Sequence, residues 1–351
     1  MTATQPGQRT GQSSRRAEPA TAGFTGEMMQ AVVQKKYGAD AEDVLGPRRI
    51  DRPGIAADEV LVRVRGAGVD RGTWHLMAGQ PYLMRLLGFG FAGPKQQVPG
   101  LDVAGTVIDV GASVTRFRPS DEVFGIARGS FAEYAAARED KLACKPARLS
   151  FEQAAVVAVS GLAALQGLRG AGRLQAGQKV LVIGASGGVG SYAVQIAKAL
   201  GAEVTGVCSA AKAGLVRSIG GDYVIDYARD DFADGRRHYD LIIDTGGNTR
   251  LSRLRRALSP AGTLVIVVGE GGKWTGLGRQ IRALTLSPLI RQRLTMFISK
   301  PRQADLDTLS QLIQTGQVTP VLDRAYPLAE VPQAIRRLQS GHAEGKLAIT
   351  I

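Results

Sequence analysis

The sequence predicts an α/β protein in which a parallel sheet covered by helices follows a smaller β-rich domain. Two observations carry this prediction. Short apolar strands separated by turn residues fill residues 28–147, a pattern typical of a barrel-like β domain. From residue 179 onward, nearly continuous apolar strands alternate with helical segments, which indicates a parallel sheet with both faces covered. The length of 351 residues agrees with two domains.

In the first domain, alternation of apolar and polar residues predicts the strands. They are expected at residues 31–33, 59–65, 104–110, 122–125, 131–136 and 141–145. Ser150, followed by an acid and an alanine-rich stretch, predicts a helix start. The second domain should then contain strands at residues 180–183, 204–207, 224–225, 241–243 and 264–268, and a helix at 189–200.

The ends of the chain differ from this pattern. Residues 1–27 are rich in Thr, Ser, Gly, Gln and Ala without an apolar core, so we expect a disordered extension. The second domain should cover residues 148–300. Residues 301–351 carry helices at 306–313 and 331–338, an extended piece at 318–322 and a strand at 346–351. We expect this C-terminal segment to return to the first domain.

Composition narrows the protein class. Two cysteines, Cys144 and Cys208, exclude a disulfide scaffold and a multi-cysteine zinc site, and fit a reduced cytoplasm. No apolar run is long enough for a membrane-spanning helix. Residues 250–302 contain eleven Lys or Arg and one acid, Glu270, within a net charge of +13. A solvated basic face is the favoured interpretation, ahead of polyanion or lipid binding, and no nucleic-acid partner is expected.

A glycine-rich loop carries the main functional signal. Gly184, Ser186, Gly187, Gly188, Val189 and Gly190 follow a predicted strand and open a predicted helix. Glycines allow a tight turn and close approach of the backbone to a pyrophosphate, which then sits at the helix N-terminus. Because a second strand follows, the context is that of a Rossmann dinucleotide-binding domain.

The residues after the second strand favour NADPH. NAD sites usually have an acid there, which binds the ribose 2′-hydroxyl. Here residues 207–212 contain none, whereas Ser209 and Lys212 suit a 2′-phosphate. Tyr227, after the third strand, is a further candidate contact. An ordinary exposed position is the alternative for Lys212.

Several motifs together resemble the medium-chain dehydrogenase/reductase superfamily, of the zinc-independent quinone oxidoreductase type, over residues 28–351. They are Gly66–Asp70, Pro99–Gly105, Phe117–Gly125, Phe131–Tyr134, the glycine loop, Gly220–Tyr227, Asp244–Gly247 and Gly345–Lys346. The resemblance implies a GroES-like catalytic domain, a Rossmann domain, an active site in the cleft between them and a homodimer.

The resemblance also implies that zinc is not used. Zinc-dependent members have Cys where this chain has Asp70, and a His-Glu pair where it has Leu101 and Asp102. A ligand set of Asp70, His75 and Asp102 is a minor alternative, since zinc needs three or four convergent ligands.

Two residues are candidates for assisting the transfer of hydride to the substrate, by donating a proton or by orienting the substrate. Tyr82 lies about where related enoyl reductases place an acidic Tyr, and either donates a proton or forms a wall. Asp70 replaces the usual Asn of quinone reductases, and either orients substrate or caps a turn. His75 is more typical of a structural residue.

Further cofactor contacts follow from the resemblance. Ser160 would replace the family's hydroxyl residue, which is Ala163 here. Gly246, Gly269 and Gly271 would lie near the nicotinamide half, and Lys346 would either reach the phosphates or only end a strand. Residues 81–91, 284–290 and 294–298 are apolar and would wall a lipophilic pocket, or belong to a core or subunit interface. Arg279, Arg282, Arg291, Arg293 and Lys300 interleave with the two later segments, as in an interfacial membrane helix, but Pro288 interrupts this stretch, so membrane contact ranks third.

Three functions therefore stay open. The first is an NADPH-dependent reductase of small lipophilic quinones or α,β-unsaturated carbonyls. The second is an alcohol dehydrogenase or carbonyl reductase, and the third is a non-catalytic nucleotide-binding partner protein.

Overall fold

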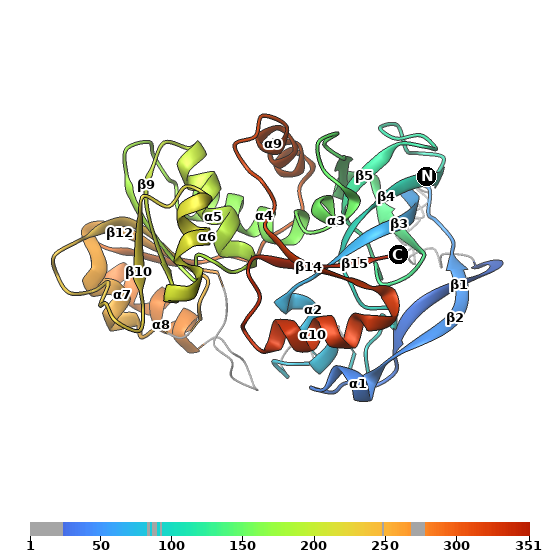
Figure 1. The fold of residues 1–351 in the computed structure, drawn as a ribbon, viewed down its shortest axis with the longest axis horizontal. Coiled ribbons are helices and arrows are strands. Elements are labelled where there is room, and N and C mark those ends of the chain that lie inside the picture. The colour runs from blue at the N-terminus through green and yellow to red at the C-terminus, as the bar shows by residue number, and fades with distance from the viewer. Residues whose placement is uncertain (1–23, 83–84, 86–89, 92, 248, 268–277) are drawn as a thin grey trace, which may run out of the picture.

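The computed structural model describes residues 24–82, 85, 90–91, 93–247, 249–267 and 278–351. Figure 1 shows the chain in two halves, one built from the middle of the chain and one from its N-terminal third and its C-terminal strands. The expected α/β architecture, with a parallel sheet and a β-rich domain, is confirmed.

A six-stranded sheet forms the centre of the half that is built from the middle of the chain. Its order is β10-β9-β8-β11-β12-β13, and all its pairs are parallel. The strands are β8 (Lys179–Ile183), β9 (Glu203–Cys208), β10 (Tyr223–Asp226), β11 (Tyr239–Asp244), β12 (Leu258–Ile266) and β13 (Arg293–Met296). The order reverses between β8 and β11, as in dinucleotide-binding sheets, where ligands bind at the carboxyl ends of the strands.

Helices pack along this sheet. They are α4 (Ala158–Leu165), α5 (Gly188–Ala199), α6 (Ala213–Ser218), α7 (Leu251–Ala257) and α8 (Gly278–Leu286), with the π-helix η3 (Gln166–Ala171) and the short 3-10 helices η4 (Ala210–Lys212) and η5 (Ser287–Leu289). The buried core beneath α5 includes Tyr192 and Ile196, both fully buried. The strands β8, β9 and β11 are buried over nearly their whole length, because helices bury both faces of a parallel sheet.

The other half, which includes the N-terminal third of the chain, contains a mixed sheet that the C-terminus completes; one of its strand pairs is parallel and the others are antiparallel. The order is β14-β15-β3-β4-β5-β7, and β6 also pairs with β3. Its strands are β3 (Glu59–Val69), β4 (Asp102–Val110), β5 (Glu122–Ile126), β6 (Tyr134–Arg138), β7 (Leu142–Cys144), β14 (Leu322–Pro327) and β15 (Lys346–Thr350). Because β15 pairs with β3, the last strand lies within the N-terminal half.

Helices α3 (Phe151–Ala154), α9 (Gln303–Gln314) and α10 (Val331–Gln339) and the turns η2 (Glu139–Lys141) and η6 (Leu328–Glu330) accompany this sheet. The helix start expected at Ser150 is confirmed, and its cause is a capping box. The Ser150 hydroxyl accepts the Gln153 N–H at 3.2 Å, and the Gln153 side chain accepts the Ser150 N–H at 3.1 Å.

Several elements differ from the expectations. β1 (Phe24–Gln34) already begins within the segment expected to be an extension, and it pairs with β2 (Leu45–Pro53), which the pattern did not predict. β2 contains two prolines and four charged residues, so pairing rather than burial maintains it. Helices α1 (Ala41–Val44) and α2 (Arg71–Ala78) were also unpredicted, and the expected extended piece at 318–322 lies ahead of β14.

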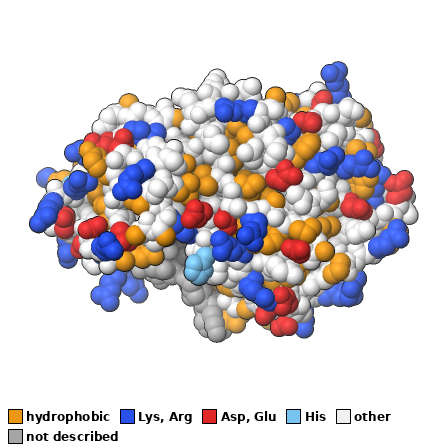
Figure 2. Space-filling view, in the orientation of Figure 1, with side chains coloured by type: hydrophobic (Ala, Val, Ile, Leu, Met, Phe, Trp, Pro, Cys, Tyr) orange, Lys and Arg blue, Asp and Glu red, His pale blue; other side chains and the backbone are white. Residues whose placement is uncertain are grey.

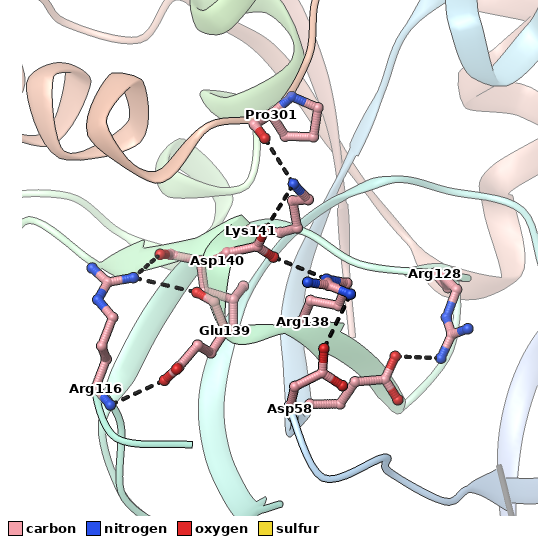
Figure 3. A network of polar contacts seen from close by, with 10 residues as sticks. Asp58, Arg116, Arg128, Arg138, Glu139, Asp140, Lys141 and Pro301 are labelled. Carbon is pink, nitrogen blue, oxygen red and sulfur yellow. Dashed lines mark hydrogen bonds and ion pairs between the residues drawn. The ribbon is translucent and has the colours of Figure 1, made fainter. Parts of the chain in front are cut away.

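Polar contacts join the two halves near η2 (Figure 3). The Lys141 ammonium donates to the carbonyl of Pro301 at 2.8 Å and to Asp140 at 3.1 Å. Arg116 donates to the backbone carbonyls of Glu139 at 3.3 Å and of Leu142 at 3.1 Å. The network fixes the segment that leads from β13 into α9 against the β-rich half.

Among the described residues, no helix is both long and apolar enough to cross a membrane. Figure 2 shows Lys and Arg side chains spread over both halves of one face, with Asp and Glu among them. Arg255, Arg256 and Arg291, from the basic segment, line an open surface depression of about 410 Å³ between α7 and the approach to β13. The segment therefore presents part of its charge at the surface.

Candidate functional site

The glycine loop follows β8 and leads into α5. Gly184 has φ of +80°, a conformation that favours glycine. Its carbonyl accepts the Gly187 N–H at 3.0 Å, which closes the turn. A Cβ on Gly190 would lie 2.0 Å from the Gly184 carbonyl oxygen, so no larger residue fits there. The loop therefore needs glycine at its turn and at its contact with the helix.

The loop geometry fits a dinucleotide pyrophosphate. Gly187 is the N-cap of α5 and has no side chain that could cap the first turn. The first N–H groups of a helix have no partner within the helix, and with the helix dipole they bind anions. The loop also lies where the strand order reverses, beside β11. Gly188, Val189 and Gly190 provide this first turn.

The residues expected around the 2′-phosphate lie beyond β9. Ser209 and Lys212 are half-buried at η4, and Tyr227 is 63% exposed after β10. The Lys212 ammonium donates to the carbonyl of Ala343 at 2.7 Å and to that of Gly341 at 3.3 Å. It thus lies against the loop that precedes β15, which sequence reasoning did not anticipate.

The same loop contacts the glycine loop. The Gly345 N–H donates to the Ser186 carbonyl at 2.8 Å, and Gly187 and Gly345 form a parallel bridge. Lys346 follows directly. A Cβ on Gly188 would lie 2.9 Å from Lys346 Cδ and 3.3 Å from Ser160 Oγ. The structure therefore brings Ser160 and Lys346 to the start of α5.

Lys346 ends in a buried charged cluster with Asp70 and Asp102. Lys346 Nζ lies 3.0 Å from Asp102 Oδ2 and 3.8 Å from Asp70 Oδ2. The Val159 N–H donates to Asp102 Oδ1 at 2.7 Å. All three charged side chains are at least nine-tenths buried. The sequence suggested Asp70 and Asp102 together only as part of a minor zinc alternative, and Lys346 only as part of the Gly345–Lys346 motif, so the ion pairs of this cluster were not predicted.

Burial dominates the electrostatics of Asp102. It raises the pKa of this carboxyl to about 6, with a further raising contribution from Asp70. Lys346 and the Val159 N–H oppose the shift because both favour the carboxylate. Tyr192, from α5, faces the same carboxylate. Burial and then Asp102 raise the pKa of its phenol, which donates to the Val156 carbonyl at 3.0 Å.

The two candidate catalytic residues have different surroundings. Asp70 is the N-cap of α2, and its Oδ1 accepts the Thr73 N–H at 2.9 Å. Its Oδ2 is buried and faces Lys346. Tyr82 is half-buried, and the Arg85 guanidinium lies 4.8 Å from its ring centroid. Asp70 thus caps a helix with one oxygen and joins the charged cluster with the other.

His75 lies on α2, close to Asp70 in sequence. Its Nδ1 is 3.1 Å from the Gln80 carbonyl, and burial lowers the pKa of the imidazole. Among the described residues, no three His, Cys, Asp or Glu side chains are grouped so that they could hold a metal ion. Asp70, His75 and Asp102 therefore form no such group in this structure.

Gly246 lies just beyond β11. Its N–H donates to Asp244 Oδ1 at 3.0 Å, while Asp244 Oδ2 forms an ion pair with Arg279. Arg279 is 3% exposed, so it is not part of an exposed basic face, and the expectation that grouped it with interfacial residues is wrong. α8 also ends at Leu286, before Pro288. Gly269 and Gly271 fall outside the described residues.

Comparisons with known proteins agree with this geometry. A family model for the alcohol dehydrogenase GroES-like domain matches residues 56–148, and one for zinc-binding dehydrogenases matches residues 219–349. The chloroplast envelope quinone oxidoreductase homolog of Arabidopsis thaliana is 30% identical over 342 residues, 93% of this chain and 99% of the relative. The mitochondrial NAD(P)H oxidoreductase RTN4IP1 of Mus musculus is 29% identical over 330 residues, 84% of this chain and 82% of the relative.

A solved structure shares the whole fold. The quinone oxidoreductase from Coxiella burnetii superimposes with a TM-score of 0.81 at 25% identity, covering 93% of this chain and 100% of its own. The similarity thus extends over nearly the whole of this chain. The chain belongs to the medium-chain dehydrogenase/reductase family of nicotinamide-dependent oxidoreductases, among its quinone oxidoreductase-like members.

Proposed function

We propose that this protein is an NADPH-dependent reductase that transfers hydride to a small lipophilic quinone or α,β-unsaturated carbonyl without zinc. The observation that carries the proposal is the glycine loop at the first turn of α5, with Ser209 and Lys212 beyond the neighbouring strand β9. A cation and a hydroxyl at that position suit a 2′-phosphate better than a ribose hydroxyl.

The chain's own residues divide the work of holding the cofactor. Gly184, Ser186, Gly187, Gly188, Val189 and Gly190 would hold the pyrophosphate. Ser209, Lys212 and Tyr227 would bind the 2′-phosphate, whereas Ser160, Gly246, Gly269, Gly271 and Lys346 would lie along the rest of the cofactor. Bound NADPH supplies the hydride.

The proton would come from a side chain. Activated acceptors such as quinones need mainly proximity and orientation, together with a proton at oxygen or carbon. Tyr82 is the proposed donor, and Asp70 the proposed orienting group. Asp102 accepts from Val159 and Lys346, so its carboxylate already has partners where zinc-dependent relatives place a ligand. The hydrogen bond from Val159 and the ion pair with Lys346 therefore support a reaction without metal.

Two further properties belong to the proposal. We propose a homodimer, as the family implies, and the edge strand β13, which among the described residues pairs only with β12, offers backbone groups for such contact. We also propose a cytoplasmic setting, because Cys144 and Cys208 are both free thiols.

The second candidate is an alcohol dehydrogenase or carbonyl reductase, favoured by the match of residues 219–349 to the zinc-binding dehydrogenase model. One experiment separates the two. Oxidation of NADPH is followed with a panel of quinones and enones, and metal content is measured on the same purified protein. Turnover with these acceptors by metal-free protein supports the reductase. Alcohol-dependent reduction of NADP⁺ by protein with stoichiometric zinc supports the second candidate, and turnover in neither assay overturns both.

A further inference from the structure

The Asp102 carboxylate lies at the meeting point of the two halves, directly behind the glycine loop. It is fully buried. One oxygen accepts the N–H of Val159 on α4, and the other pairs with Lys346 at the start of β15. Both α4 and β15 send a side chain to Gly188, namely Ser160 and Lys346. The Asp102 carboxylate therefore binds both segments, α4 and β15, that contact Gly188 at the start of α5.

The ammonium of Lys346 can point to Asp102 or to the glycine loop, because the side chain passes between them. Its Cδ lies against Gly188, where an added Cβ would be 2.9 Å away, yet its ammonium turns from the loop to Asp102. Rotation about the last two side-chain bonds moves Nζ without moving the backbone. The ammonium is thus within a side-chain rotation of the anion-binding turn, and Asp102, the nearer of its two carboxylate partners, holds it away.

The charges around Asp102 come from three elements. Lys346 of β15 pairs with it, Asp70 at the end of β3 faces the same ammonium at 3.8 Å, and Tyr192 of α5 is kept neutral. With both acids ionised, one ammonium faces two carboxylates. Burial and Asp70 raise the pKa of Asp102 to about 6, close enough to neutrality for a neighbouring anion to favour its protonation.

We propose that Asp102 is a positioning residue that controls whether Lys346 is available to the phosphates of the bound dinucleotide. Ionised Asp102 holds and neutralises the ammonium, and protonated Asp102 releases it. The inference rests on the proposed function, because it takes the glycine loop as the phosphate site. A proton from solvent adds to the carboxylate, and no covalent bond is made.

Cofactor affinity and protonation are then linked. An anion at the loop favours the state with one more proton, so dinucleotide affinity rises as pH falls through the range in which Asp102 titrates. Asp102→Asn keeps an acceptor for the Val159 N–H and removes the charge. We expect this variant to bind NADP⁺ about threefold to tenfold more tightly than the wild type at pH 7.5, from one charge removed near the site.

The test is calorimetric titration of NADP⁺, which is stable in acid, at pH 7.5, 6.5 and 5.5. The wild type is compared with Asp102→Asn, Lys346→Met and, as a matched control, Asp109→Asn, because Asp109 is an exposed acid on the same strand β4. The 2′-phosphate itself titrates near pH 6, but equally in every variant, so ratios between variants cancel it. We expect the threefold to tenfold gap between the wild type and Asp102→Asn to close at pH 5.5. Lys346→Met should bind weakly, and Asp109→Asn should behave as the wild type.

A gap that stays constant with pH, or a weaker affinity of Asp102→Asn at pH 7.5, overturns the inference while leaving the proposed function intact. If the wild type binds neither NADP⁺ nor NAD⁺, the proposed function is overturned instead. If Asp102→Asn does not fold, the wild type is titrated at pH 6.5 with NADP⁺ and NAD⁺ in two buffers of different ionisation enthalpy. Net proton uptake with NAD⁺, which lacks the 2′-phosphate, supports the inference, and zero uptake overturns it.

Discussion

Lys346 Nζ and Asp102 Oδ2 lie 3.0 Å apart although 244 residues separate them in the chain. The pair exists because β15 returns to pair with β3, while β4 pairs with the other side of β3. It joins the C-terminus to the β-rich half at the point where the glycine loop begins α5. The stability and the chemistry of this region are therefore linked.

The free energy of unfolding should depend on pH because of the buried Asp102 carboxyl. Its pKa of about 6 in the folded protein exceeds the value of 3.8 for a free carboxyl, so the folded state binds the proton more tightly. The free energy of unfolding of the wild type, relative to Asp102→Asn, should therefore rise as pH falls through about 6 and level off near 4. The rise should be at most about 3 kcal/mol. Denaturant titrations at pH 7.5, 6 and 4.5 measure it, and a difference that does not change with pH would contradict the shift.

Lys212 should set the preference for NADPH. Lys212→Glu places an acid where NAD sites carry one, and it repels a 2′-phosphate. We expect the ratio of NADPH to NADH affinity to fall at least about tenfold, equivalent to about 1.4 kcal/mol. Fluorescence titration with both cofactors measures the ratio. Lys179→Glu is the control, because Lys179 is exposed at the start of β8, whereas the glycine loop follows the other end of that strand. An unchanged ratio in Lys212→Glu would show that the 2′-phosphate lies elsewhere.

Gly190 should tolerate no side chain. In Gly190→Ala the new Cβ would lie 2.0 Å from the Gly184 carbonyl oxygen, so the loop must shift. We expect a loss of about 1–3 kcal/mol of stability, as for overpacked sites, together with weaker cofactor binding. Gly214→Ala is the matched control, because a Cβ at Gly214 would meet nothing within 4 Å. Thermal unfolding with and without NADPH separates the two effects. Equal behaviour of the two variants would argue against the close approach.

The buried Asp244–Arg279 pair should be costly to break. Removing one partner leaves the other charge buried and unbalanced, so Arg279→Met should lose about 3–5 kcal/mol of stability. Arg253→Met, which breaks the exposed pair with Asp231, should lose at most about 1 kcal/mol. Urea denaturation measures both. Similar small losses would mean that the Asp244–Arg279 pair contributes little.

Tyr82 should matter for turnover more than for binding. If its phenol donates the proton, Tyr82→Phe should lower kcat by about a hundredfold or more, with little change in the affinity for NADPH. Tyr223→Phe is the control, because Tyr223 is exposed on β10. Single-turnover measurements with a quinone and an enone report on the step. A kcat within about twofold of the wild type would assign Tyr82 to the pocket wall, since general acids contribute far more.

Local patterns were sufficient where one segment of chain fixes its own structure. The glycine loop, the helix start at Ser150 and the apolar strands β8 and β11 depend on neighbours within a few residues, and all were predicted. β2 and β13 were not, because an edge or paired strand with charged residues carries little periodicity. Arg279 was placed at the surface from composition, although its partner Asp244 lies 35 residues earlier.

The same distinction holds for the site. The residue order of the chain was enough to identify a dinucleotide loop and a strand without a following acid, because turn geometry and helix ends are local properties. The positions of Lys346, Asp102 and Ser160 around Gly188, and the contact of Lys212 with the loop at Gly341 and Ala343, arise from pairing between strands far apart in the chain. Charges on distant strands interact only after the sheet has closed, and burial then determines which of them stay ionised.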